Sequence, residues 1–513
     1  MSLHNVARFT DLREDRGTRV EIGSLKIVLL RAGERVYAYQ GECPHAQAPL
    51  DEGIVCNGRL ICPWHKAMFT VEDGQVCEPP ALNGLTRYPV KIVDGDVHVD
   101  DQPLAPIEVN RAPDSRCFVI VGAGAAGTAA TAALREHGFA GRLVLIDRET
   151  DPGYDRTVLS KYVLAGEMSV EETPPLLDER FYNEQHIERV QGEVIRLDVA
   201  AKRVSLGDGR TFDYDAALLA SGGEPRPLSV DGAHLHNILA LRSRADAERI
   251  LHIAKPGTRV VIIGASFIGL ESASALRRHG LEVSVVAHHE TPFSTLFGER
   301  IGMAILSLHE DNGVVFHANT QPKAFEGQDN VEAVLLENGQ RLPADLVLIG
   351  IGVNPVTDLL EGVELDDDGG LPVNEGMRAA PGLWAAGDIA SFAWQGFPTR
   401  IEHWRLAQQQ ARIAAQNMLG VETRYVDVPF FWTYHFDKTF EMLGHADQWD
   451  RIVFEGNPEQ YAFIALLCKG ERVEAVVACE YSRQMALLAE RMKQPLLREE
   501  ALQIIRRIAA QEG

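Results

Sequence analysis

The chain has 513 residues, enough for roughly three or four domains, and its 45% hydrophobic and 24% charged residues are typical of a globular protein. Its net charge of -23 disfavours binding to nucleic acid or to an anionic membrane, because both repel an acidic surface. No apolar run reaches the roughly 18 residues of a membrane span, and the charged N-terminus is unlike a signal peptide. The seven unevenly spaced cysteines do not suggest a disulfide framework. We therefore expect a cytoplasmic protein.

The first hundred residues are expected to form a small all-β domain. Short runs rich in β-branched and aromatic residues alternate here with Gly, Asp and Pro turns, which is typical of a compact β-sheet domain. These runs are Lys26–Leu30, Arg35–Tyr39, Val90–Val93 and Val97–Val99.

Two short loops within this domain carry metal-ligating side chains. They are Cys43 with His45, and Cys62 with His65, with 16 residues between the pairs. Two thiolates and two imidazoles suit either a structural zinc ion or a [2Fe-2S] cluster. A zinc finger usually pairs Cys with Cys and His with His, whereas each loop here offers one of each. Two equivalent loops can clamp a binuclear cluster, with both Cys on one iron and both His on the other, so the spacing favours the cluster.

This pattern, including the Pro that follows each Cys, closely resembles Rieske proteins, and the resemblance implies that these four residues ligate a [2Fe-2S] cluster. Rieske proteins of the cytochrome bc type have an extra Cys in each loop, where this chain has Ala48 and Trp64. The chain is more similar to the Rieske ferredoxins of oxygenase systems. We therefore expect a potential low in the Rieske range, because fewer hydrogen bonds reach the cluster sulfurs.

Residues 103–116 contain three prolines and little periodicity, and they are interpreted as an extended interdomain linker. A βαβ unit follows in Cys117–Asp147. Gly122 allows a tight turn, Gly124 lets the backbone approach a pyrophosphate at the helix N-terminus, and Gly127 lets helix and strand pack closely. Asp147 is placed to accept hydrogen bonds from ribose hydroxyls, so the unit is expected to hold an ADP group.

After this unit, the segment YDR-x-x-LSK resembles the ferredoxin reductase and apoptosis-inducing factor family. The resemblance implies that Arg156 contacts the flavin nucleotide and that Lys161 lies beside the isoalloxazine. Disulfide reductases of the glutathione reductase type place C-x4-C on this segment, and here no Cys lies between positions 117 and 468. Dithiol chemistry is therefore excluded.

A second βαβ unit begins at Val260 and is expected to bind a nicotinamide dinucleotide. Ser266 replaces the middle glycine but is still small. At the end of the second strand stands Ala287, where relatives that use NADH have an acid, and no Arg is offered for a 2′-phosphate. We expect NADH, with NADPH as the open alternative. The turn residues expected to contact the nucleotide are Gly264, Ala265, Ser266, Phe267, Ile268 and Gly269.

Further site residues are implied by the same family resemblance. Glu271 is expected to form an ion pair with Lys161 beside the flavin, and these two are the candidate catalytic residues. Asp388 is expected on the flavin ribityl chain, with Gly387 allowing its approach. The other cofactor-binding candidates are Arg226, Gly352, Glu402, His403, Trp404 and Trp432, of which Glu402 to Trp404 are expected to begin a helix.

The expected fold is a small all-β Rieske domain, then an α/β flavoprotein with two nucleotide domains (glutathione-reductase-like), then an α+β domain. The boundaries are 1–102 for the Rieske domain, 103–116 for the linker, 117–240 with 370–424 for the FAD-binding domain, 241–369 for the NAD(P)H-binding domain and 425–513 for a C-terminal interface domain ending in one helix.

The arrangement resembles Rieske-containing apoptosis-inducing-factor-like proteins and oxygenase-type ferredoxin reductases. It implies that electrons pass from NAD(P)H through FAD to the Rieske cluster and on to an external protein such as an oxygenase or a cytochrome P450. A flavin oxidase, or a redox-sensing signalling protein in which the Rieske domain is regulatory, is the alternative. The chain is expected to be a monomer or a homodimer.

Overall fold

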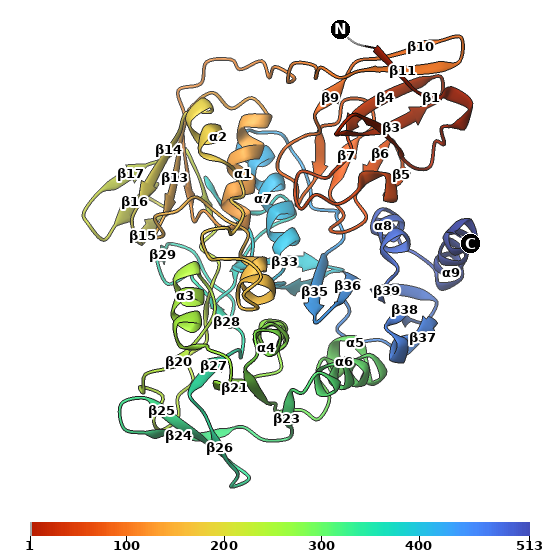
Figure 1. The fold of residues 1–513 in the computed structure, drawn as a ribbon. Helices are drawn as coiled ribbons and strands as arrows, with labels where there is room; N and C mark the ends of the chain where they lie inside the picture. Colours follow the sequence, from red (N-terminus) through yellow and green to blue (C-terminus); the bar gives the residue numbers. More distant parts are fainter. Residues whose placement is uncertain (1–2, 513) are drawn as a thin grey trace.

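The computed structural model describes residues 3–512 (Figure 1). Its N-terminal part consists of three antiparallel sheets, as the alternating β-prone runs predict. The first sheet has the order β2 (Thr18–Ile22), β3 (Leu25–Ala32), β4 (Arg35–Gln40), β9 (Arg87–Tyr88). The second has the order β1 (Leu3–Arg8), β11 (Asp96–Asp100), β10 (Val90–Val93), and the third β5 (Ile54–Cys56), β6 (Arg59–Ile61), β7 (Met68–Thr70), β8 (Val76–Glu78). The ligand loop with Cys62 and His65 joins β6 to β7 of the third sheet, and the loop with Cys43 and His45 lies between β4 and β5.

Residues 101–116 form no helix or strand and join this part to the first nucleotide-binding sheet, as expected of a linker. That sheet has six strands, and the glycine-rich turn follows β12, its third strand. The order is β14 (Ile187–Gln191), β13 (Arg142–Asp147), β12 (Cys117–Val121), β18 (Ala216–Leu219), β32 (Leu383–Ala385), β31 (Arg378–Ala380). Helices α1 (Ala125–Glu136) and α7 (Trp404–Met418) pack against each other beside this sheet.

A second parallel sheet contains the second βαβ unit. Its order is β20 (Ile238–Leu239), β27 (Leu346–Ile349), β21 (Arg259–Ile263), β22 (Glu282–Val286), β23 (Val315–His317), with helices α3 (Arg244–Ile253), α4 (Phe267–Arg278), α5 (Ser294–Phe297) and α6 (Glu299–Asp311). Smaller elements complete the two nucleotide-binding parts: α2 (Glu179–Glu184), β15 (Val194–Asp198), β16 (Arg203–Leu206), β17 (Thr211–Asp213), β19 (Gly223–Pro225), β24 (Pro322–Gly327), β25 (Val331–Leu336), β26 (Arg341–Pro343), β28 (Val353–Pro355), β29 (Leu360–Glu361), β30 (Leu371–Pro372), β33 (Ala390–Trp394) and β34 (Phe397–Thr399).

The C-terminal part is a five-stranded antiparallel sheet followed by helices (Figure 1). The strand order is β35 (Phe430–His435), β36 (Lys438–Gly444), β39 (Arg472–Cys479), β38 (Ala462–Lys469), β37 (Arg451–Asn457). The expectation of one terminal helix was wrong, because two helices occur, α8 (Ser482–Arg491) and α9 (Arg498–Glu512). Pro495 lies between them, and a proline cannot donate the backbone hydrogen bond that a continuous helix needs.

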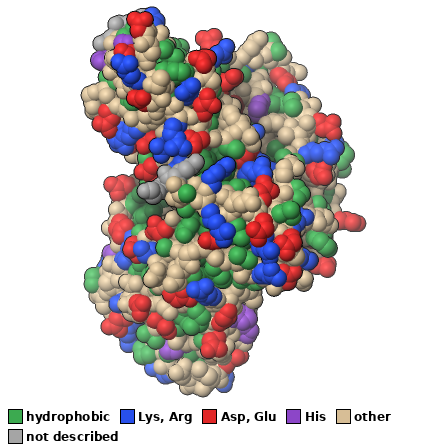
Figure 2. All heavy atoms as spheres, turned by 90° about the vertical axis from the view of Figure 1, so that its right-hand side faces the viewer, with side chains coloured by type: hydrophobic (Ala, Val, Ile, Leu, Met, Phe, Trp, Pro, Cys, Tyr) green, Lys and Arg blue, Asp and Glu red, His purple; other side chains and the backbone are tan. Residues whose placement is uncertain are grey.

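The N-terminal part packs directly against the C-terminal sheet and against α7, in addition to its covalent connection through the linker. Ile54, Ile61 and Met68 share one hydrophobic cluster with residues of the C-terminal sheet such as Phe430 and Leu443. On the face drawn in Figure 2, acidic and basic side chains are interspersed over all parts of the surface. The docked arrangement brings the ligand residue His65 against Trp432 of β35.

Candidate functional site

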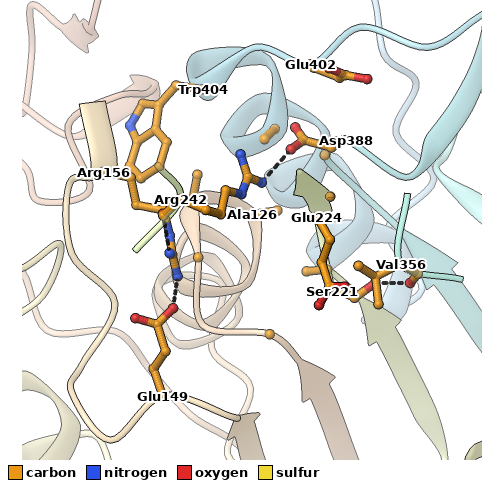
Figure 3. Close-up of a pocket in the computed structure, with 18 of the residues that line it drawn as sticks. Ala126, Glu149, Arg156, Ser221, Glu224, Arg242, Val356, Asp388, Glu402 and Trp404 are labelled. Carbon is orange, nitrogen blue, oxygen red and sulfur yellow. Dashed lines mark hydrogen bonds and ion pairs between the residues drawn. The ribbon is translucent and has the colours of Figure 1, made fainter. Parts of the chain in front are cut away.

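A deep pocket lies where the two nucleotide-binding parts and strand β35 meet (Figure 3). Its wall combines residues from positions 121 to 432, so it is assembled by the fold and not by one segment. Fourteen of the residues predicted from sequence line it: Gly122, Gly124, Asp147, Arg156, Lys161, Phe267, Ile268, Glu271, Gly387, Asp388, Glu402, His403, Trp404 and Trp432.

The glycine-rich turn of the first βαβ unit leaves room for a ligand at the start of α1. Gly122 has φ of +101°, and a Cβ there would collide with the carbonyl oxygen of Ala220. A Cβ on Gly127 would collide with the carbonyl oxygen of Gly122, so this glycine serves close packing. A Cβ on Gly124 would meet nothing within 4 Å, and no side chain caps α1. The backbone N–H groups of the first turn therefore remain for a phosphate group, which the helix N-terminus stabilises.

Two carboxylates, Asp147 and Glu149, lie beside this turn. Asp147, expected to bind a ribose, accepts hydrogen bonds from the backbone N–H groups of Ala123 and Glu149. Glu149 also lines the pocket and pairs with Arg156, whose guanidinium donates to the carbonyl oxygen of Arg242 at 2.9 Å (Figure 3). Although burial opposes it, Tyr154 and Glu149 raise the pKa of Arg156. The sequence did not single out Glu149, although an acid two residues after the expected one is a visible signal.

Asp388, the second predicted acid, also lines the pocket. Arg242, which was not predicted, donates to Asp388 at 2.8 Å (Figure 3). Glu402 and His403 precede α7 rather than begin it, because the helix starts at Trp404. Burial and the nearby Asp388 raise the pKa of Glu402. Burial lowers the pKa of His403 to about 4, so its imidazole is neutral at ordinary pH.

The expected ion pair between the two candidate catalytic residues is present. Lys161 Nζ lies 3.0 Å from Glu271 Oε2, and both side chains are about 5% exposed. Lys161 lies in a short π-helical turn, Leu159–Val163, which follows a 3₁₀ turn at Arg156–Val158 after β13. Glu271 lies on α4. Glu271 also accepts from the Ser160 hydroxyl at 2.5 Å and from the Thr433 hydroxyl at 2.8 Å. Neither hydroxyl was predicted, and both hold the carboxylate against the pocket wall.

The second βαβ unit has the same tight glycine turn as the first but a capped helix. Gly264 has φ of +103°, and a Cβ there would collide with the carbonyl oxygen of Gly350. The Ser266 hydroxyl accepts from the Gly269 N–H at 3.1 Å and so caps α4, a role that the sequence did not predict for it. Ala265 and Gly352 belong to the same edge. Gly264, Ala265, Ser266, Gly269 and Gly352 do not line the pocket, unlike Phe267 and Ile268 of the same turn.

Two predicted nucleotide-binding residues also lie outside the pocket wall. Ala287 follows β22 and is buried, and its N–H donates to the carbonyl oxygen of His317. Arg226 donates to the carbonyl oxygen of Val353 at 3.0 Å. His288, His289 and Glu290, which follow Ala287, are all exposed, and Glu290 is a carboxylate three residues after the usual position.

The four candidate metal ligands come together as two pairs. The Cys43 and Cys62 thiols are within hydrogen-bonding distance, and this contact and burial raise the pKa of Cys43. The Nδ1 atoms of His45 and His65 lie 3.0 Å apart. Paired thiols beside paired imidazoles fit a [2Fe-2S] cluster with both Cys on one iron and both His on the other, and they do not fit a single tetrahedral zinc ion as well.

The cluster-ligand end of this domain faces the pocket, which the sequence did not predict. The rings of His65 and Trp432 have centroids 4.1 Å apart, and Trp432 lines the pocket. His45 Nε2 lies 3.7 Å from a carboxylate oxygen of Asp155, a residue of the YDR segment. Long-range contacts of this kind leave no local signal in a sequence.

Buried polar contacts hold the domain in this position. Glu78 of β8 accepts from Arg405 at 2.6 Å and from Gln409 at 3.0 Å, both on α7, and it pairs with Lys493. Although burial opposes it, Arg405 and Lys493 lower the pKa of Glu78 to about 2. Lys66, fully buried next to the ligand His65, pairs with Glu441 of β36 at 2.5 Å. α7 thus has buried charged residues because it lies between two domains.

Two dinucleotide-binding units that face one pocket, with a Rieske-type ligand set against its wall, define a flavin-dependent oxidoreductase that carries its own cluster domain. The chain belongs to the pyridine nucleotide-disulphide oxidoreductase family, whose model matches residues 117–411. The Rieske [2Fe-2S] domain model matches residues 2–89, and the reductase C-terminal model matches residues 430–499.

Relatives of known name agree with this assignment. Human apoptosis-inducing factor 3 is 34% identical over 510 residues, which cover 94% of this chain and 83% of that protein. The ferredoxin--NAD(+) reductase component of the biphenyl dioxygenase system of Paraburkholderia xenovorans is 34% identical and covers 72% of this chain and 91% of its own. The solved covalent complex of putidaredoxin reductase with putidaredoxin has a TM-score of 0.71 at 31% identity, over 76% of this chain and 96% of that one.

The protein is therefore an FAD-dependent NAD(P)H oxidoreductase of the ferredoxin reductase type, with FAD, a Rieske [2Fe-2S] cluster and NADH as cofactors. The uncapped start of α1, the open space at Gly124 and the paired Cys and His ligands fit these groups. Within residues 3–512 no helix is long and apolar enough to cross a membrane.

Proposed function

We propose that this protein passes electrons from NADH through FAD to its own Rieske cluster and then to an external electron-accepting protein, such as an oxygenase or a cytochrome P450. One observation carries the proposal: Trp432 lines the flavin pocket and its ring lies 4.1 Å from that of the cluster ligand His65. The Trp432 side chain therefore lines the pocket and also contacts a ligand of the cluster. The relative named as a reductase component of a dioxygenase system supports the same direction of transfer.

The cofactors supply the redox chemistry, since NADH delivers two electrons as a hydride, FAD takes two and releases one at a time, and the cluster accepts one. The residues of this chain hold and orient them. Gly122 and Gly124 admit the pyrophosphate at α1, and Asp388 is held toward the pocket by Arg242. The Lys161–Glu271 pair places a compensated cation at the wall that Trp432 also forms, with Lys161 Nζ 6.0 Å from the centroid of that ring.

In the proposed division, residues 1–102 carry the cluster, 103–116 link it, 117–240 with 370–424 bind FAD, 241–369 bind NADH and 425–513 supply the wall between pocket and cluster. The docked position of residues 3–102, with His65 against Trp432, supports this division. Transfer to the cluster would then need no domain movement, because the contact already exists.

Electrons must leave the cluster by a different side from the one by which they enter. The rings of His45 and His65 face Asp155 and Trp432, so the flavoprotein itself occupies the surface where a partner of an isolated Rieske ferredoxin would be expected. Trp64, in contrast, is 43% exposed, and its ring centroid lies 6.4 Å from that of His65. We assign the outward path to the surface around Trp64.

Anaerobic stopped-flow spectroscopy tests the proposed function. On mixing with NADH, the flavin absorbance should fall first and the cluster absorbance should fall next, at a rate compatible with turnover of an external one-electron acceptor. Cys62→Ser should remove the Rieske-type paramagnetic resonance signal and keep the first phase, because the flavin pocket contains no part of that loop. A cluster that stays oxidised while the flavin is reduced would contradict the proposed route.

That contrary result would favour the second candidate, a flavin oxidase or a redox-sensing protein in which the Rieske domain is regulatory. The specific observation in its favour is the match to human apoptosis-inducing factor 3 over 94% of this chain, which includes the Rieske domain. Direct reaction of the reduced protein with oxygen, at a rate that Cys62→Ser leaves unchanged, would distinguish this function.

A further inference from the structure

A buried chain of hydrogen bonds leads away from the Lys161–Glu271 pair on the side opposite the pocket. Thr433 Oγ1 donates to Glu271 Oε1 at 2.8 Å and lies 3.0 Å from His435 Nε2. His435 Nδ1 in turn lies 3.2 Å from His309 Nε2. Thr433, His435 and His309 are fully buried, and Figure 1 shows β35 between α4 and α6, the helices that carry the two ends of this chain.

The hydrogen-bond directions along this chain are determined by its inner end. Glu271 accepts from the Lys161 ammonium, the Ser160 and Thr433 hydroxyls and the Tyr434 N–H, which is the behaviour of a carboxylate. Since the Thr433 hydroxyl hydrogen points to Glu271, its oxygen accepts the Nε2–H of His435. His435 Nδ1 must then accept the Nε2–H of His309, which leaves His309 Nδ1 without a hydrogen.

His309 Nδ1 is the outer end of the chain, and it is an acceptor with no partner among residues 3–512. Leaving such a buried polar atom unpaired is unfavourable, because it has lost its hydrogen bonds to water without gaining others. His309 lies in the last turn of α6, directly before the exposed residues 310–313. His309 itself is fully buried, so a solvent proton has to pass the end of α6 to reach the unpaired nitrogen, while Glu271 at the other end of the chain lines the cofactor pocket.

Both imidazoles are neutral. Burial, together with the nearby Lys161, lowers the pKa of His435 to about 3. Burial and the facing His435 lower the pKa of His309 well below its usual value. The Leu270 backbone of α4 also hydrogen-bonds His435, and three aromatic rings pack on the pair: Phe316 of β23, Phe440 of β36 and Phe436 after β35. A neutral imidazole with one N–H and one free nitrogen can pass a proton on without holding a charge.

We propose that His309, His435 and Thr433 form a proton relay that delivers one solvent proton to Glu271 when negative charge enters the cofactor pocket. A proton binds His309 Nδ1, the Nε2 proton of His309 moves to His435 Nδ1, the Nε2 proton of His435 moves to Thr433 Oγ1, and the hydroxyl proton moves to Glu271 Oε1. Each N–H or O–H bond that breaks is matched by one that forms, and no electron is transferred along the chain.

The need for this proton follows from the charges of the site. In the resting state Lys161 and Glu271 cancel each other in a buried environment. A hydride that enters from NADH adds one negative charge, and an uncompensated charge in a buried site is costly. Protonation of Glu271 frees the Lys161 cation to balance the added charge. The three relay residues act on the reaction through Glu271, so they are positioning and proton-transfer residues rather than contacts of the substrate.

Thr433 offers a matched pair of variants. Thr433→Val has nearly the same shape but lacks the hydroxyl, and Thr433→Ser keeps it. The full-length protein with its cofactors is mixed anaerobically with NADH in weak buffer that contains a pH indicator dye. In the wild type and in Thr433→Ser we expect about one proton to be taken up per flavin reduced, in the same phase as the flavin absorbance change. In Thr433→Val the uptake should lag that change by at least tenfold.

A second measurement keeps the inference testable if the valine variant does not fold. The pH dependence of the flavin midpoint potential should correspond to two protons per two electrons in the wild type, and to one in Glu271→Gln. Absence of proton uptake in the wild type, or synchronous uptake in Thr433→Val, would overturn the relay. Proton uptake and the flavin midpoint potential both report on flavin reduction and not on cluster reduction. The relay can therefore be refuted while the proposed transfer to the cluster holds, and the transfer can be refuted while the relay holds.

Discussion

Glu78→Gln should release the Rieske domain from its docked position. Glu78 is buried and pairs with Arg405 and Lys493. Its substitution by a neutral residue of the same shape leaves the buried Arg405 guanidinium without its carboxylate partner, whereas Lys493 keeps Asp427 and Glu490. Removing one partner of a buried ion pair costs about 3–5 kcal/mol. Taking the lower value of about 3 kcal/mol, because Gln still hydrogen-bonds to Gln409, docking should weaken by roughly 150-fold.

The docking equilibrium can be measured after the linker is cut. Residues 104–109 are exposed, so a protease recognition sequence can be placed there. After cleavage, the wild-type N-terminal fragment should coelute with the flavoprotein in size-exclusion chromatography, because the buried contacts of Glu78 and Lys66 remain. The fragment of Glu78→Gln should dissociate at micromolar concentrations.

Glu34→Gln provides the control, since Glu34 is an exposed carboxylate of the same domain. It should behave as the wild type does. FAD content and the NADH-dependent flavin phase should be unchanged in both variants, because neither residue lines the pocket. If Glu78→Gln binds the flavoprotein within threefold of the wild-type affinity, the buried network does not hold the domains together and the reasoning is refuted.

The remaining predictions concern electron exit and the relay. Trp64→Ala should slow reduction of an external one-electron acceptor at least severalfold and leave cluster reduction by NADH unchanged in stopped-flow experiments; slowing of both steps would contradict an exit at Trp64. His435 has a pKa lowered to about 3, so the folded state binds fewer protons than the unfolded state below pH ~6.5, and stability is lost as the pH falls through that window. The stability advantage of the wild type over His435→Asn in urea denaturation should therefore shrink by about 2 kcal/mol between pH 7.5 and pH 5, whereas a constant difference would mean that His435 does not titrate as its burial requires.

The sequence predicted the parts of this protein that local chemistry determines. The βαβ unit expected in Cys117–Asp147 begins with strand Cys117–Val121 and ends with strand Arg142–Asp147, and it was predictable because parallel strands buried on both faces appear as continuous apolar runs. The ligand pairs and the glycine turns were recognisable because cluster ligation and phosphate binding each require particular residue types at short spacings. The Lys161–Glu271 pair came from family resemblance, since nothing local connects two residues 110 positions apart.

What the sequence did not predict depends on the packing of domains. No rule links Asp155 to His45 or Lys66 to Glu441, because each pair joins two independently patterned domains. Buried charges on α7 were equally hidden, since an amphipathic pattern does not tell whether a polar face contacts water or another domain. Arg405 of that helix is only 1% exposed and donates to the carbonyl oxygens of Lys66 and Pro79.

Strand β35 shows how one segment can serve two different transfers. Successive side chains of a strand point to opposite faces, so Trp432 belongs to one face and Thr433 and His435 belong to the other. Trp432 contacts the cluster ligand His65, whereas Thr433 contacts Glu271 and His435. In our proposals electrons therefore leave the pocket along one face of this strand and a proton arrives along the other. A shift of one residue in the pairing of β35 with β36 would exchange the two faces, so the register Trp432↔Glu441 and Thr433↔Phe440 is as necessary for function as the residues themselves.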